Sequence, residues 1–87
     1  METRILLNET TFTNLCKSGF LTQKDPQYGT TDLHITTLDM KNLATGGIVT
    51  KNITGSVFEI ALQDIGFELT KEIIKRSPVY SQMYYEI

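Results

Sequence analysis

VFEIALQDIGFELTKEIIKR, residues 57–76, is the part of the chain with the most extended helical periodicity. Three of its apolar residues, Ile60, Phe67 and Ile74, recur every seven positions and form a narrow seam. A surface helix needs only one apolar side, so this seam would require a cover of its own. The other apolar side chains, projected at 100° per residue, form a separate and wider stripe that we expect to lie on a sheet. That stripe comprises Phe58, Ala61, Leu62, Ile65, Leu69 and Ile73.

Both ends of this predicted helix carry boundary signals. Ser56 and Glu59 have the S-x-x-E spacing of a capping box, in which each side chain can bond the other residue's backbone amide. Pro78 disfavours helical backbone at the residue before it. The last turn is basic, which suits the negative end of the helix dipole. Its cations are Lys71, Lys75 and Arg76.

Shorter helices are predicted on either side. Apolar residues at helical spacing lie between Asn8, a favourable N-cap, and Gly19, a favourable C-terminal residue, which predicts a helix over 9–18. A second short helix is expected over 39–44, with Thr36 and Asp39 as its capping box. Residues 78–86 are predicted to form a terminal helix with Pro78 in its first turn.

Alternating sequence predicts the strands. The clearest run covers 30–38, where Leu33 and Ile35 would face inward, and another covers 47–53. A further strand is expected to begin at 20–23, with a turn over 24–29, and 4–7 would be an edge strand or an N-terminal arm. The predicted fold is therefore α+β: a small antiparallel sheet of two or three strands packed on one long helix, with short N-terminal and C-terminal helices.

Size and composition limit the class of protein. The 87 residues, 40% hydrophobic and 21% charged, are expected to form a single domain over 1–87. A formal net charge of -2 disfavours non-specific attraction to nucleic acid or to anionic membranes. The single cysteine, Cys16, excludes an intramolecular disulfide and favours a reducing compartment. There is neither a long apolar run nor a signal-peptide pattern, so we expect a cytoplasmic protein without a membrane partner.

Residues that carry chemistry are few. Cys16, His34 and Asp32 are the nearest approach to a nucleophile, a base and an orienting group, but no motif surrounds them. One histidine and one cysteine give no metal-ligand spacing. Gly46 and Gly47 lack the Lys-Ser/Thr of a phosphate-binding loop. The lysines are scattered, so nucleic-acid binding is possible but not favoured. We therefore expect no enzymatic activity, no cofactor and no metal.

Two features instead indicate binding to another molecule. The first is the Ile60/Phe67/Ile74 seam, which either the C-terminal segment or a second molecule would have to cover. The second is the tail 80–85, which holds three of the four tyrosines together with a methionine, residue types that are enriched in interface cores. The predicted partner-binding residues are Ile60, Phe67, Ile74, Tyr80, Met83, Tyr84 and Tyr85.

In general character the chain resembles the small accessory proteins that phages encode to bind and inhibit host machinery, anti-CRISPR proteins among them. The resemblance lies in small size, acidic charge and an interface-like tail, and it covers no specific motif. It implies a non-enzymatic protein-binding module, an inhibitor of a host nucleic-acid-processing enzyme in the host cytoplasm. The alternatives are a structural homo-oligomer that pairs with a second copy, and a small nucleic-acid-binding regulator.

Overall fold

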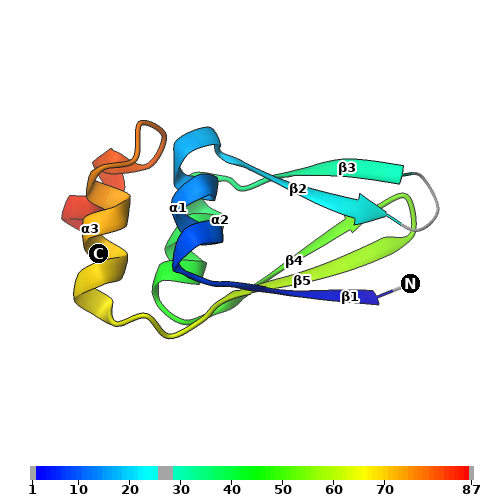
Figure 1. Cartoon of the computed structure of the whole chain (residues 1–87), viewed down its shortest axis with the longest axis horizontal. Coiled ribbons are helices and arrows are strands. Elements are labelled where there is room, and N and C mark those ends of the chain that lie inside the picture. Colours follow the sequence, from blue (N-terminus) through cyan, green and yellow to red (C-terminus); the bar gives the residue numbers. More distant parts are fainter. Residues whose placement is uncertain (1, 26–28, 87) are drawn as a thin grey trace.

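The computed structural model describes residues 2–25 and 29–86. Within these residues the chain forms five strands in two sheets and four short helices, and its class is α+β. The strands run along the 38 Å long axis and the helices gather at one end of them (Figure 1). The elements follow the order β1 (Glu2–Leu7), α1 (Glu9–Ser18), β2 (Phe20–Asp25), β3 (Gly29–His34), α2 (Thr37–Ala44), β4 (Ile48–Ile53), β5 (Ser56–Leu62), α3 (Phe67–Lys75) and the 3-10 helix η1 (Ser81–Glu86).

The larger sheet has the strand order β1-β5-β4, and the described parts of β2 and β3 form a separate antiparallel pair. β5 is central: Ile60 pairs with Ile5 of the parallel strand β1 and with Val49 of the antiparallel strand β4. Buried side chains from both sheets and all four helices belong to one hydrophobic cluster. The expected purely antiparallel sheet is therefore corrected to a mixed one.

The prediction of one long helix over 57–76 is wrong, and with it the expected sheet packed on a single helix. Its first part is strand β5, in which buried Phe58 and Ile60 alternate with less buried Val57, Glu59 and Ala61. This period of two, with β-branched and aromatic side chains, is that of a strand with one face in the core. Only the second part, α3, is helical.

Three residues with positive φ separate β5 from the elements on either side of it in the chain. Thr54 and Gly55 form the two-residue turn between the paired residues Ile53 and Ser56, with φ of 46° and 86°. Positive φ at both positions matches the twist of a tight hairpin, so Ser56 opens a strand rather than capping a helix. Gly66, with φ of 92°, then precedes the first residue of α3.

Most of the shorter predicted elements are present. The helix over 9–18 is confirmed: the Asn8 side chain accepts the Thr11 amide, and Gly19 ends the helix with φ of 82°. The capping box of Thr36 and Asp39 is confirmed in α2, which begins two residues earlier than predicted. Strand β4 matches the expected 47–53, and β1 is a strand at the sheet's edge.

Three predicted boundaries need correction. The strand expected over 30–38 ends at His34, because α2 starts at Thr37. Residues 78–86 do not form one helix; a 3-10 helix covers only 81–86. The turn expected over 24–29 lies partly outside the described residues.

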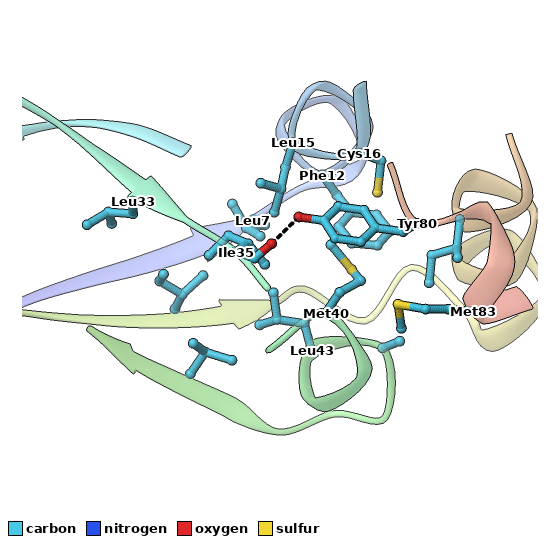
Figure 2. Packing of buried hydrophobic residues seen from close by; sticks show 14 of the residues in the cluster. Leu7, Phe12, Leu15, Cys16, Leu33, Ile35, Met40, Leu43, Tyr80 and Met83 are labelled. Carbon is cyan, nitrogen blue, oxygen red and sulfur yellow. Dashed lines mark hydrogen bonds between the residues drawn. The ribbon is translucent and has the colours of Figure 1, made fainter. Parts of the chain in front are cut away.

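Tyr80 joins the C-terminal segment to the core. Its side chain is 2% exposed, and its hydroxyl donates a hydrogen bond to the backbone carbonyl of Ile35 (Figure 2). The amide of Ile35 donates a hydrogen bond to the carbonyl of Gly19. Both backbone polar groups of Ile35, which connects β3 to α2, are therefore hydrogen-bonded. Nearby, the Ser77 hydroxyl donates to the Cys16 carbonyl and accepts the Tyr80 amide. Burial raises the pKa of the Tyr80 phenol to about 12, with smaller contributions from Cys16 and Asp39.

A partly buried ion pair fixes α2 against the larger sheet. Lys51 of β4 donates to the carboxylate of Asp39, and the two side chains are 22% and 19% exposed. Asp39 also accepts the Thr36 amide as part of the capping box. Burial acts to raise the pKa of Asp39, but the bonds from Lys51 and Thr36 outweigh it and hold the pKa below its usual value.

Replacing Tyr80 by Phe is expected to lower the free energy of unfolding by ~1–3 kcal/mol, because the buried Ile35 carbonyl loses its hydroxyl partner. Denaturant titration followed by circular dichroism measures the change. Tyr85→Phe is the matched control, since Tyr85 is 85% exposed and should leave stability unchanged. Equal stability of both variants would show that the Tyr80 hydroxyl does not stabilise the fold.

The Asp39 ion pair predicts a pH dependence. A lowered pKa in the folded state means that this stabilisation is present above pH 4 or so and is lost as pH falls through the folded pKa. Asp39→Asn should therefore lower the free energy of unfolding by ~1 kcal/mol at pH 7 and by progressively less at lower pH. Denaturant titrations between pH 7 and pH 3 measure it. The exposed Glu86→Gln controls for net charge, and a pH-independent effect of Asp39→Asn would contradict this role of its carboxylate.

Candidate functional site

The structure divides the predicted partner-binding residues into two groups. Ile60 on β5 and Ile74 on α3 are both 0% exposed, so the predicted seam is not a surface. Tyr80 and Met83, each 2% exposed, also lie in the core, where Figure 2 shows them from close by. The remaining three, Phe67, Tyr84 and Tyr85, reach the surface where α3 meets η1.

These three rings lie together with two lysines, and we call the set of Phe67, Lys71, Lys75, Tyr84 and Tyr85 the aromatic–lysine patch. The Lys71 ammonium lies 5.4 Å from the centre of the Phe67 ring and 5.1 Å from that of Tyr84. The Lys75 ammonium lies 5.2 Å from the Tyr84 ring centre. Tyr84 and Tyr85 meet edge to face, with centroids 5.1 Å apart.

Local sequence explains why these groups converge. Phe67, Lys71 and Lys75 follow a spacing of four, which places them along one side of α3. The adjacent side of the helix enters the core through Ile74 and Thr70, and the Thr70 hydroxyl bonds the Gly66 carbonyl. The C-terminal segment is then anchored by Tyr80 and Met83, which leaves Tyr84 and Tyr85 beside the two lysines.

The patch is exposed to an unusual degree for aromatic side chains. Phe67 is 53% exposed and Tyr85 is 85% exposed, so neither ring contributes much to the core. Each cation–π contact is worth ~0.5–1 kcal/mol at an exposed site. These contacts restrain long lysine side chains that would otherwise sample many rotamers. The patch is therefore partly pre-organised to present apolar area and positive charge together.

The sequence did not single out Lys71 and Lys75 as members of a site, because their charge was attributed to the helix dipole. Their spacing from Phe67 was the signal that could have identified them. Next to this row on α3, Glu72 pairs with Arg76 at 3.9 Å, so an acidic side chain lies close to the patch.

The groups considered for catalysis are not assembled. Cys16 is 2% exposed in α1, and burial raises the pKa of its thiol to about 12. His34 and Asp32 lie on the exposed side of β3, where His34 contacts the Phe20 ring and Asp32 accepts a bond from Thr22. The buried thiol does not reach that exposed face, so these residues form no nucleophile–base pair.

Within residues 2–25 and 29–86, no three His, Cys, Asp or Glu side chains are grouped so that they could hold a metal ion. None of the helices described is long and apolar enough to cross a membrane.

No family profile matches the chain, and no curated protein or solved structure is significantly similar to it. The case for a site therefore rests on the geometry of the aromatic–lysine patch.

Native Cys16 is expected to react with a thiol reagent at pH 8 at least ~100-fold more slowly than in the unfolded chain, because its thiol is both buried and protonated. The rate of colour release from a disulfide reagent, measured with and without denaturant, tests this. Comparable rates in the two states would show that α1 and α3 separate readily in solution and expose the thiol.

Proposed function

We propose that this protein is a non-enzymatic protein-binding module whose contact surface is the aromatic–lysine patch. The observation that carries the proposal is the exposure of Phe67 and Tyr85 beside two lysines held against aromatic rings. Large rings in water do not stabilise the isolated fold. On association the rings would be removed from water, and this burial would stabilise the complex by roughly 25 cal/mol per Å² of apolar area.

The composition of the patch indicates the chemistry of the partner. Tyrosine and other aromatic residues dominate the energetic centres of interfaces, because they bury much area at low entropic cost. Lys71 and Lys75 add two positive charges at the same place. We therefore propose a partner surface that offers an apolar hollow flanked by carboxylates, since opposite charge speeds encounter and excludes partners of the wrong sign.

The more specific form of the proposal is an inhibitor of a host nucleic-acid-processing enzyme, of the kind that phages encode. Its support is the general character of the chain: 87 residues, a net charge of -2 and an exposed aromatic–lysine patch. Such a protein acts by occupying a surface of its target and needs no chemistry of its own.

Single-stranded nucleic acid is the second candidate, because the patch combines aromatic rings that could stack on bases with lysines that could meet phosphates. The charge balance weighs against it. Glu68 and Glu72 lie on the same helix, and the chain as a whole is negative. A phosphate backbone would meet this repulsion over most of its length.

Removing patch side chains should abolish partner binding without unfolding the protein. Tyr85→Ala and Lys71→Glu are each expected to weaken binding about tenfold or more, the effect of losing an interface hot spot. The measurement compares which proteins the immobilised wild-type and variant chains retain from a host lysate, followed by titration of any retained protein.

Leu38→Ala is the matched control, because Leu38 is 71% exposed on α2, outside the patch. A partner retained equally by wild type, Tyr85→Ala and Lys71→Glu would contradict the proposal. Titration with a single-stranded oligonucleotide at several salt concentrations forms the second arm. Tight, salt-dependent binding that Lys71→Glu removes would favour the nucleic-acid alternative.

A further inference from the structure

A second surface lies on the face of the β1-β5-β4 sheet that points away from the core. The strand register places Leu6 of β1 and Ile48 of β4 on either side of Ala61 of β5. Leu6 is 66% exposed and Ile48 is 62% exposed. Because the Ala61 side chain is small, it forms the base of a shallow depression, and Leu6 and Ile48 form its two sides. The resulting hollow has a volume of about 340 Å³ and also involves Arg4, Ile5 and Glu59.

The end of this hollow that is nearer to the first residue of β5 carries the Glu59 carboxylate and the Arg4 guanidinium. Glu59 is the next outward residue on β5, and its side chain is 26% exposed. The neighbouring Glu2 carboxylate, together with burial, raises the pKa of Glu59, while Arg4 acts in the opposite direction. Arg4 and Glu59 form an ion pair, with 3.8 Å between Arg4 Nε and Glu59 Oε1, although this distance is too long for a hydrogen bond. Among the described residues, Glu59 Oε1 is buried without a hydrogen-bond partner.

The sheet hollow and the aromatic–lysine patch have complementary chemistry. One is an apolar depression beside two carboxylates, Glu2 and Glu59, and one guanidinium, Arg4, so that negative charge exceeds positive charge by one. The other is a set of projecting rings beside the ammonium groups of Lys71 and Lys75. A depression of about 340 Å³ falls in the range of pockets that hold small organic groups, and one aromatic side chain is of that class. The two surfaces belong to different elements, the strands in one case and α3 with η1 in the other, as Figure 1 shows.

We propose that the acceptor for the aromatic–lysine patch is the sheet hollow of a second copy of this chain. The inference rests on the proposed function, because it names a partner for the same patch. Tyr85 of one copy enters the hollow between Leu6 and Ile48 of the next, and Lys71 and Lys75 approach the Glu59 carboxylate. The occupant is a second copy because this chain itself carries both halves of the complementary pair.

The contact is head to tail, so a bound pair still presents one free hollow on the first copy and one free patch on the second. Such a heterologous contact forms a closed ring where the rotation between copies closes and an open chain of copies where it does not. Both surfaces are small, and the one on the sheet spans only its three strands. Interfaces below the standard size are weak and transient, so the assembly is expected to form and dissolve with dilution.

Two complementary variants test the geometry. Tyr85→Ala with Lys71→Glu removes the patch and keeps the hollow, whereas Leu6→Lys with Ile48→Lys fills the hollow with positive charge and keeps the patch. All four positions are at least partly exposed, and circular dichroism confirms that each variant folds. Sedimentation velocity is recorded for wild type, each variant and their mixture, at concentrations up to about 1 mM.

Head-to-tail binding predicts that the wild-type mass increases from that of the monomer as concentration rises. Each variant alone remains a monomer, because one half of every contact is missing. Mixed together, the variants form a one-to-one dimer and nothing larger, because only one intact patch meets one intact hollow. A wild type that stays monomeric throughout, or whose association survives in either variant, overturns the proposal.

The same samples separate this inference from the proposed function. A monomeric wild type whose Tyr85→Ala variant loses a different protein partner refutes self-association and leaves the patch as a protein-binding surface. Head-to-tail assembly with no other partner supports the inference.

Discussion

The position of β5 between two partners is the constraint on which the rest of the structure depends. Both of its backbone edges are engaged, through parallel pairing with β1 and antiparallel pairing with β4. The parallel pair joins the first strand of the chain to a strand more than fifty residues later. Everything between Leu7 and Ser56 must therefore be arranged as a connection that returns to the same sheet. One inward side of β5 then carries Phe58 and Ile60 into the core that this connection builds.

A second constraint follows at the C-terminus, where one segment contributes to both the core and the surface. Tyr80 is bonded to Ile35, and Ser77 bonds the end of α1, so the chain is anchored before η1 begins. The 3-10 helix then places Met83 inward and Tyr85 outward within three residues. The buried side chains of Tyr80 and Met83 thus hold in place the segment that exposes Tyr85. This is the arrangement that a small domain needs if it is to display apolar groups without losing its fold.

Sequence reasoning succeeded where local signals determined the structure and failed where a tertiary partner did. The caps at Asn8, Gly19 and Thr36 act over three or four residues, and the elements they bound were predicted. Residues 57–62 satisfy a helical period and a strand period at once, and the S-x-x-E pattern favoured the helix. Pairing on both sides by β1 and β4 decided for a strand, and such long-range partners cannot be seen in one sequence. The sequence left open whether the C-terminal segment or a second molecule covers Ile60 and Ile74; both are buried within this chain, Ile60 on β5 and Ile74 on α3.

The arrangement of layers explains why a chain this small has two candidate contact surfaces. The described helices collect at one end of the strands instead of covering the face of the larger sheet (Figure 1). A mixed sheet of three strands therefore keeps its outward side in water, and Leu6 and Ile48 remain exposed there. Packing α3 against that side would have covered them, but α3 is tied to η1 and to the α1–α2 end of the core. The same placement that exposes the aromatic–lysine patch thus leaves the hollow of the sheet uncovered.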